Sequence, residues 1–235
     1  MKIFGKNVAL EKLNSNTKIY KIYLSNKFSD KNILSLIEKK NIKKVVVDNR
    51  ELDKMCKGLH QGIVLEVENV KTYDLEETLN KINKEYPLIV ILDHIEDPHN
   101  FGAIIRSCEA FGIDAIIIPN DRSVDINSTV VKVSVGTIEK MKIVKVVNIN
   151  NAIKVLKEYG YWIVGTDMEG VPYTDIDYKT KIAVVIGNEG KGISRLVSEN
   201  CDYLAKIPMK GTVNSLNASV ACGIFLSEIN RSRGE

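Results

Sequence analysis

The hydrophobic pattern changes near residue 86. From Leu88 onward, short continuous apolar runs alternate with stretches of helical spacing. Such runs are typical of strands that are buried on both faces of a parallel sheet. We therefore expect an α/β fold with a mostly parallel sheet flanked by helices, in which ligands bind beyond the carboxyl ends of the strands. The predicted strands are 88–93, 115–119, 143–147, 162–166, 182–187 and 204–207, and the predicted helices are 101–111, 127–137, 151–159, 193–199 and 215–231.

The first seventy residues have a more mixed pattern and predict a smaller α/β domain. Its expected helices are 3–13, 30–40 and 50–56, and either Asp30 or Ser29 is expected to cap the second of them. Its expected strands are 19–24, where apolar and polar residues alternate, 45–47, which we expect to be buried, and 63–67. Residues 72–85 have little core-forming surface and predict a polar linker helix. The expected domains are therefore 1–70 and 87–235, joined by a linker helix at 71–86.

Positive charge is concentrated in the first domain. The chain of 235 residues has a formal net charge of +3, but residues 1–70 hold 14 Lys and Arg against 8 Asp and Glu. Such a surface suits contact with a phosphate backbone, although a solvated lysine-rich surface without a partner would look the same.

Composition and cysteine spacing exclude several classes of protein. The longest apolar runs, Leu88–Leu92 and Ile182–Ile186, are far shorter than the roughly 20 residues of a membrane helix. The start of the chain has no apolar secretion segment, so we expect a cytoplasmic protein. The four cysteines show no C-x-x-C pair and are expected to be reduced thiols, neither zinc ligands nor disulfides.

Three segments of the larger domain do not have the pattern of core. The first, Leu92–Arg106, leaves a strand, turns at Asp97-Pro98, and continues into a helix that we expect Asn100 to cap. Arg106 follows in the second turn of an otherwise apolar helix. It must face a site or be paired, and pairing with Glu109 at the helix surface is the simpler alternative.

The second segment, Ile186–Ser194, lies between a buried strand and a helix and contains three glycines. Glycines at such a turn let a ligand approach the backbone and expose N–H groups at the start of a helix. The G-x-x-G-x-G spacing is neither the dinucleotide motif nor a Walker loop, and Glu189 would repel a phosphate. An ordinary tight turn is the alternative.

The third segment, Ile207–Ala221, runs from a strand through a polar loop into a helix rich in small residues. Its polar residues Asn214, Ser215 and Asn217 gather where the helix begins. Capping explains one of these three residues but not all of them.

In order and spacing, the three segments resemble the three motifs of the SpoU/TrmH family of RNA 2′-O-ribose methyltransferases, within the SPOUT superfamily. The residues Gly5–Leu13 and His60–Ile63 look like the substrate-binding domain that some members carry. The combination is most similar to bacterial enzymes that methylate a guanosine ribose in 23S ribosomal RNA. The resemblance implies S-adenosyl-L-methionine as the cofactor, structured RNA as the partner, no metal, a homodimer, and a deep trefoil knot in the C-terminal domain. Hydrophobic periodicity cannot indicate a knot, since knots are nearly absent from proteins.

The resemblance also implies the roles of individual residues. The expected catalytic residues are Asn100, Arg106, Glu189, Ser215 and Asn217, and the expected cofactor-binding residues are Thr166, Gly187, Asn188, Gly190, Ile207, Met209 and Leu216. The resemblance assigns Arg106 to the 2′-hydroxyl. Because an arginine is always protonated, we expect Arg106 to orient the hydroxyl or to hold a nearby phosphate rather than to remove a proton. Deprotonation would then be late, or assisted by water or an RNA phosphate.

Three other functions make distinct predictions about these motifs. A tRNA ribose methyltransferase of the same family would have the same motifs. A non-catalytic RNA-binding or ribosome-assembly protein predicts eroded motifs, yet the expected catalytic residues are all present. A nucleotide hydrolase predicts a lysine directly before Ser or Thr in the glycine-rich segment, and Lys191 is followed by Gly192.

Overall fold

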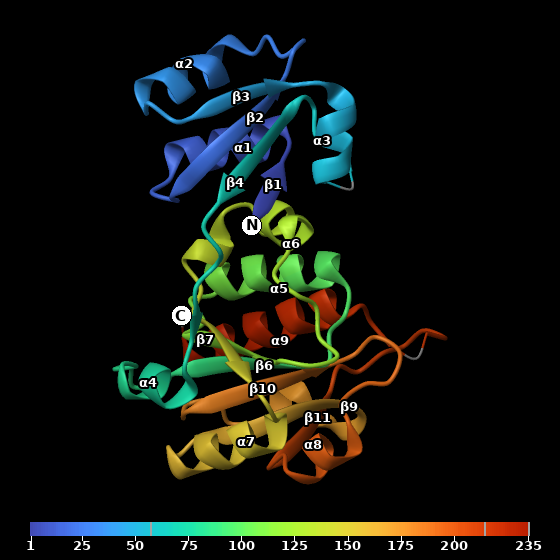
Figure 1. Cartoon of the computed structure of the whole chain (residues 1–235). Coiled ribbons are helices and arrows are strands. Elements are labelled where there is room, and N and C mark those ends of the chain that lie inside the picture. Colours follow the sequence, from blue (N-terminus) through green and yellow to red (C-terminus); the bar gives the residue numbers. More distant parts are fainter. Residues whose placement is uncertain (57, 214, 235) are drawn as a thin grey trace. The chain divides into compact units, whose positions relative to one another are not determined.

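The computed structural model of the chain describes residues 1–56, 58–213 and 215–234. The chain divides into two units (Figure 1). The first comprises Met1–Val70 with Ile126–Gly136, and the second comprises Lys71–Asp125 with Thr137–Glu235. Each unit has its own sheet.

The first unit is built on a four-stranded sheet in the order β1-β4-β2-β3. The strand β4 pairs antiparallel with both β1 and β2, and β2 pairs parallel with β3. Leu13, Ile22, Ile33 and Leu65 are fully buried and form part of its core. The elements are β1 (Lys2–Phe4), α1 (Lys6–Asn14), β2 (Ile19–Ser25), α2 (Lys31–Lys39), β3 (Lys44–Val47), α3 (Asn49–Met55), β4 (Ile63–Val67) and α6 (Ser128–Ser134).

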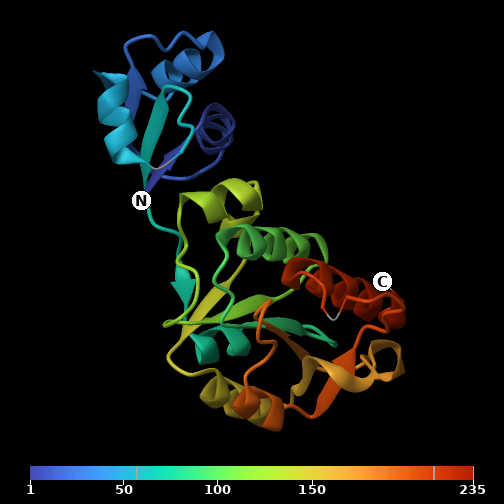
Figure 2. The same cartoon turned by 90° about the vertical axis from the view of Figure 1, so that its right-hand side faces the viewer.

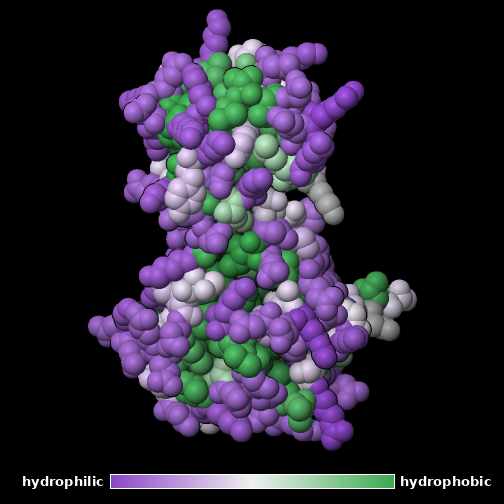
Figure 3. All heavy atoms as spheres, viewed as in Figure 1, coloured by the Kyte–Doolittle hydropathy of each residue, from purple (hydrophilic) through white to green (hydrophobic). Residues whose placement is uncertain are grey.

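Two predictions for this unit were wrong. The helix expected from residue 3 begins at Lys6, because Lys2–Phe4 pair with β4 as a short strand. The strand at 45–47 exists but is not buried. It is an edge strand whose residues alternate in exposure, with Val46 62% exposed, and Figure 3 shows apolar surface in the region where Figure 1 draws β3. The cap of α2 is confirmed, since Asp30 accepts a hydrogen bond from the Ile33 N–H at 3.3 Å.

The second unit contains a seven-stranded sheet in the order β11-β9-β10-β6-β7-β8-β5. Every pair of neighbouring strands is parallel, which confirms the predicted sheet. The strands are β5 (Thr72–Tyr73), β6 (Leu88–Asp93), β7 (Ala115–Pro119), β8 (Ile143–Val146), β9 (Trp162–Pro172), β10 (Ile182–Gly187) and β11 (Tyr203–Lys206). The helices are α4 (Leu75–Asn80), α5 (Pro98–Ala110), α7 (Ile149–Glu158), α8 (Arg195–Glu199) and α9 (Ala218–Arg233), with 3₁₀ turns η1 (Thr137–Glu139) and η2 (Tyr173–Asp175).

Helices cover both faces of this sheet. The helices α5 and α9 lie on one face, and α7 and α8 lie on the other (Figures 1 and 2). All six residues of β6 and all six of β10 are buried between these layers. This double burial explains why both strands read as continuous apolar runs.

Two segments of the second unit differ from their prediction. Residues 72–85 do not form one polar helix: Thr72–Tyr73 pair with β8, and the helix is confined to Leu75–Asn80, where Leu79 joins the core. The strand expected at 162–166 continues to Pro172, because Val171 and Pro172 pair with β11 beyond a register shift. Among the described residues, no helix has the length and apolar character needed to cross a membrane.

Candidate active site

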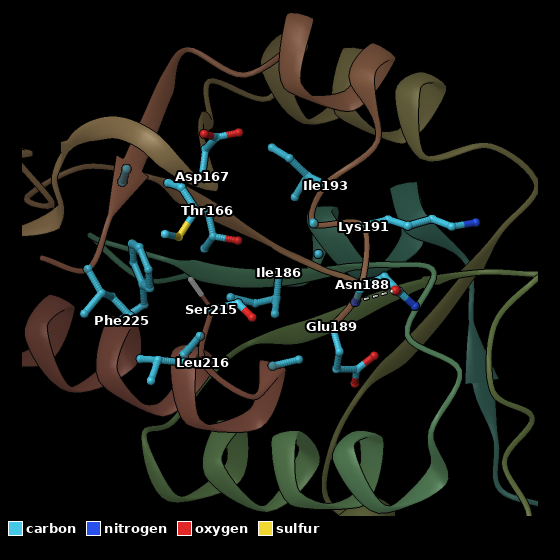
Figure 4. Close-up of a pocket in the computed structure, with 18 of the residues that line it drawn as sticks. Thr166, Asp167, Ile186, Asn188, Glu189, Lys191, Ile193, Ser215, Leu216 and Phe225 are labelled. Carbon is cyan, nitrogen blue, oxygen red and sulfur yellow. Dashed lines mark hydrogen bonds between the residues drawn. The ribbon is translucent and has the colours of Figure 1, made fainter. Parts of the chain in front are cut away.

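A pocket of about 400 Å³ lies at the carboxyl ends of β9, β10 and β11 and the start of α9 (Figure 4). Its charged lining residues are Asp167, Glu189 and Lys191, and much of the remaining lining is apolar or backbone. Two carboxylates and one ammonium make this a poor site for a polyphosphate and a suitable one for a ligand that carries positive charge. The lining also includes Thr166, Met168, Ile186–Asn188, Gly190, Gly192, Ile193, Ala205, Ile207, Met209, Ser215, Leu216, Ala218, Ala221 and Phe225.

The loop after β10 doubles back sharply on itself. The N–H of Asn188 donates to the carbonyl of Gly192 at 3.0 Å, and the Gly192 N–H donates to the carbonyl of Asn188 at 2.8 Å. At Gly187 a Cβ atom would lie 2.2 Å from the carbonyl carbon of Gly192, so only glycine fits. The closed loop therefore depends on backbone contacts that a side chain at Gly187 would break.

The end of β6 holds both ends of this loop. The carboxylate of Asp93, which is 1% exposed, accepts a hydrogen bond from the Ser194 N–H at 2.6 Å and another from the Nδ1 of His94. The carbonyl of His94 accepts from the amide of Asn188 at 3.0 Å, and that amide's oxygen accepts from the Gly190 N–H at 3.0 Å. His94 itself adopts a left-handed conformation with φ of 60°.

Three residues that are far apart in sequence form a hydrogen-bonded chain. The amide of Asn217 donates to Asn100 Oδ1 at 2.8 Å, and the amide of Asn100 donates to the carboxylate of Glu189. In Figure 4 the side chain of Glu189 points from the loop toward α5, where Asn100 lies. Asn100 is thus the link between the second and third segments.

The predicted cap of α5 was wrong. The cap is Asp97, whose carboxylate accepts from the His99 N–H at 3.0 Å, and Asn100 lies within the helix. The proline after Asp97 occupies the first turn, where a missing N–H has no cost, so the helix begins earlier than expected. This shift frees the amide of Asn100 for Glu189 and Asn217.

The third segment also forms less helix than predicted. The helix α9 begins at Ala218 instead of residue 215, and Asn217 caps it by accepting from the N–H of Ser219 at 2.9 Å. Ser215 lines the pocket ahead of the helix. Asn214, the first polar residue of this group, lies outside the described residues.

Arg106 is exposed and does not line the pocket. In the described part of the chain its guanidinium has no ion pair or hydrogen bond. The alternative of a pair with Glu109 was wrong, because Glu109 binds Lys140 at 2.9 Å. Arg106 is therefore available to a bound molecule, on the same helix that carries Asn100.

The structure brings most of the expected residues together. All seven expected cofactor-binding residues line the pocket, as do Glu189 and Ser215, while Asn100 and Asn217 join it through Glu189. Sequence reasoning missed Asp93, although a lone carboxylate that ends an apolar strand is a recognisable signal. It also missed Asp167 and Phe225, which carry no such signal.

The chain's thiols do not offer a nucleophile near this pocket. Burial, together with Asp202, raises the pKa of the Cys201 thiol to about 12, and burial beside Cys222 raises that of Cys108 well above its usual range. Both thiols are protonated at neutral pH and therefore poorly nucleophilic. Among the described residues there is also no group of three or more His, Cys, Asp or Glu side chains placed to hold a metal ion.

Two family models match separate parts of the chain. Residues 87–227 match the SpoU rRNA methylase family, and residues 2–73 match the RNA 2′-O ribose methyltransferase substrate-binding family. The chain is 39% identical to the putative TrmH family tRNA/rRNA methyltransferase YacO of Bacillus subtilis, over 98% of this chain and 95% of that protein. It is 42% identical to the 23S rRNA (guanosine-2′-O-)-methyltransferase RlmB of Coxiella burnetii, over 92% of this chain and 89% of that protein.

Solved structures have the same fold. The SpoU methyltransferase AviRb of Streptomyces viridochromogenes, in complex with AdoMet, aligns with a TM-score of 0.85 at 23% identity and covers 100% of this chain and 91% of its own. An AdoMet-bound rRNA methyltransferase of Sinorhizobium meliloti aligns with a TM-score of 0.78 at 25% identity, over 98% and 86% of the two chains. With the family model spanning residues 87–227 and the pocket assembled from its three motifs, the chain belongs to the SpoU rRNA methylase family.

Proposed function

We propose that this methyltransferase acts on a ribose 2′-hydroxyl of 23S ribosomal RNA, at a guanosine. Membership of the SpoU family makes the protein an RNA methyltransferase that uses S-adenosyl-L-methionine. The choice of target is supported by the 42% identity to an enzyme named as a 23S rRNA guanosine methyltransferase. The basic first domain, which matches the substrate-binding family, supports an RNA partner.

The observation that carries the proposal is the pocket. The apolar side chains of Ile207, Met209, Leu216 and Phe225 suit an adenine and a thioether, and the carboxylates of Asp167 and Glu189 suit ammonium and sulfonium charges. The donor set of this pocket therefore fits the cofactor of the family. When bound, S-adenosylmethionine supplies an activated methyl group on a positively charged sulfur.

Positioning is the main contribution of the protein to this reaction. A sulfonium is already a good leaving group, so the enzyme must align the 2′-oxygen with the methyl and manage one proton. Asn217 and Asn100 fix the carboxylate of Glu189 at the edge of the pocket. Arg106 orients the hydroxyl or holds a neighbouring phosphate, because a protonated guanidinium donates hydrogen bonds and accepts none.

A tRNA target is the second candidate. The Bacillus subtilis relative, at 39% identity, is named for both tRNA and rRNA. The catalytic residues do not separate the two targets, because ribose chemistry is the same in each. A difference must come from the surface that binds the RNA, which the first unit supplies in our proposal.

We also infer a homodimer and a knotted C-terminal domain, as the resemblance implies. The exposed face of α9 supports the dimer, because Val220, Gly223 and Ile224 line a shallow depression with Tyr173. Small and apolar residues on an exposed helix face suit close packing against another helix. Light scattering of the purified protein tests the dimer, and a monomer at micromolar concentration contradicts it.

An in vitro methylation assay tests the proposed function. Unmodified 23S rRNA and unmodified tRNA transcripts are each incubated with the enzyme and labelled S-adenosylmethionine. We expect label in 23S rRNA at a guanosine, and resistance of the following phosphodiester to alkali, because the free 2′-oxygen is needed for that cleavage. Label in tRNA alone favours the second candidate, and alkali-sensitive label would place the methyl on a base and overturn the proposal. The Asn100→Ala variant serves as the inactive control.

A further inference from the structure

A second cavity of about 400 Å³ lies within the first unit. It is open to solvent and is lined by the start of α1, the last residue of β2, residues 27–29, residues Asn49 and Asp53 of α3, and the loop at 58–62. All of these segments belong to the matched substrate-binding region at residues 2–73. None of them lines the methyltransferase pocket, so this cavity is separate from it.

The loop at 58–62 has a strained backbone. Gln61 adopts φ of 52°, and Gly58 and Gly62 adopt φ of 150° and 81°. A Cβ atom at Gly62 would lie 3.1 Å from the ring of Phe28, so the ring would have to shift by a few tenths of an ångström. Glycine adopts such angles without strain, whereas at Gln61 the left-handed conformation costs free energy and persists because surrounding contacts hold it.

Several polar groups around the cavity are occupied in building it. The Lys6 N–H donates to Gln61 Oε1 at 2.8 Å, and the Gly62 N–H donates to His60 Nδ1 at 2.9 Å. Because Nδ1 accepts, the His60 proton lies on Nε2, which faces Asp53 Oδ1 at 3.1 Å. These contacts fix the shape of the loop and are not free to read a ligand.

Four other side chains at the cavity are free to do so. In the described part of the chain, the side chains of Lys27, Ser29 and Asn49 make no ion pair or hydrogen bond. Leu59 is 75% exposed at the same cavity. The cavity therefore presents a cation, a hydroxyl, an amide and an apolar side chain together.

We propose that this cavity binds one unpaired nucleotide of the RNA substrate. A cation neutralises a phosphate, an amide reads the hydrogen-bonding edge of a base, and an apolar side chain covers a base face. In this arrangement Lys27 holds the phosphate, Asn49 and Ser29 contact the base or ribose, and Leu59 packs on the base. The inference rests on the proposed action on RNA and adds a recognition site distant in sequence from the catalytic motifs.

Only an unpaired nucleotide fits these requirements. In an RNA duplex the major-groove edges of the bases are recessed in a deep, narrow groove, and both faces of each base are stacked and so closed to a side chain. A concave cavity with a free amide and a free apolar side chain therefore favours a base that has left the helix. A surface that recognised only phosphates would need neither Asn49 nor Leu59.

Binding of short RNA to the full chain tests the proposal. Fluorescence anisotropy measures the affinity for a labelled single strand of about 12 nucleotides, a length within the usual range of single-strand sites, and for the same strand in a perfect duplex. The variants are Lys27→Ala, Asn49→Ala and Leu59→Ala, which change exposed or surface side chains. Lys39→Ala, on the exposed face of α2, is the control that removes an equal charge outside the cavity.

We expect tighter binding of the single strand than of the duplex. Asn49→Ala and Leu59→Ala should each weaken binding of the single strand by about fivefold or more, as loss of base contacts does, with little effect on the duplex. Lys27→Ala should lower the slope of log affinity against log salt by about 0.7, the value for one phosphate of a single strand. Lys39→Ala should change neither quantity.

Two results would overturn the proposal. The first is equal or tighter binding of the duplex by the unaltered protein, and the second is unchanged binding of the single strand by Asn49→Ala and Leu59→Ala. The assay contains no cofactor and needs no methyl transfer. A protein that bound the single strand as expected but methylated no RNA would contradict the proposed function and leave this site in place.

Discussion

The carboxylate of Asp93 and the backbone N–H of Ser194 lie 2.6 Å apart, although 101 residues separate them in the chain. The hydrogen bond joins the end of β6 to the end of the glycine-rich loop. Because Asp93 also accepts from His94, whose carbonyl holds Asn188, one buried carboxylate sets the position of the whole loop. Asp93 is thus a positioning residue for the cofactor pocket.

Replacing Asp93 should weaken cofactor binding. Asp93→Asn keeps the size of the side chain but removes its charge and turns one acceptor into a donor, so the hydrogen bond to His94 survives only if the ring proton of His94 moves to Nε2. We expect the dissociation constant for S-adenosylmethionine, measured by titration calorimetry, to rise about tenfold, in line with roughly 1–3 kcal/mol for an unsatisfied buried group. Asp97→Asn is the matched control, since asparagine caps a helix as well as aspartate does. An unaltered dissociation constant in Asp93→Asn would show that the loop holds its shape without this carboxylate.

Two glycines of the same loop should respond differently to alanine. At Gly187 the added Cβ would lie 2.2 Å from the backbone of Gly192, whereas at Gly190 its nearest neighbour is Asn188 Oδ1 at 3.6 Å, an ordinary contact. We expect Gly187→Ala to lower the free energy of unfolding by about 2–3 kcal/mol and to abolish cofactor binding. Gly190→Ala should change the melting temperature little. Equal melting temperatures for the two variants would contradict the close backbone packing at Gly187.

Arg106 should matter for turnover and not for the cofactor. Its guanidinium is exposed, unpaired among the described residues, and outside the lining of the pocket. We expect Arg106→Lys to lower the single-turnover rate by about tenfold or more, because lysine cannot hold a hydroxyl or phosphate with a planar fork. The dissociation constant for S-adenosylmethionine should stay within about twofold.

The control for this experiment is Arg195→Lys. Arg195 lies on the surface of α8, where it pairs with Glu199 at 2.7 Å. We expect its single-turnover rate to match that of the unaltered enzyme. A near-normal rate in Arg106→Lys would remove Arg106 from the catalytic residues.

The pair of Glu228 and Arg231 on α9 should make stability depend on pH. Hydrogen bonds from Arg231 lower the pKa of Glu228 below its usual 4.5. Because the pKa of Glu228 is lower in the folded protein than in the unfolded chain, its charged carboxylate stabilises the fold at pH values above the pKa of the unfolded chain. This contribution is lost as the pH falls through the pKa of Glu228 in the folded protein. In urea unfolding, Glu228→Gln should cost about 0.5–1 kcal/mol at neutral pH and nothing in acid. A difference that persists in acid would assign the effect to packing.

Strands that are buried on both faces could be predicted from the sequence to the residue. The bounds of β6, β7 and β10 match their predictions, because each apolar run stops at a residue that cannot continue it: Asp93, Pro119 and Gly187. The extension of β9 could not be predicted in this way. Its later residues include the polar Asp167 and Glu169, and it is Val171 and Pro172 that pair with β11, across a register shift that no local pattern records.

The candidate site was predicted by motif and not by geometry. Periodicity places Asn100 near the start of a helix, but it does not say whether Asp97 or Asn100 forms the cap. That choice depends on the partners Glu189 and Asn217, which lie far along the chain. The exposed edge strand β3 was misread for a similar reason, since three consecutive valines look the same at an edge as in a core.

The hydrogen bonds that join Asn100, Glu189 and Asn217 also affect the order in which the protein folds. These two hydrogen bonds close loops of 89 and 117 residues. Contacts of such long range form after local helices and nearby strand pairs, because the chain must first pay the entropy of closing the loops. The catalytic arrangement is therefore among the last features to form, and during refolding the helical signal in circular dichroism should return before the capacity to bind S-adenosylmethionine does.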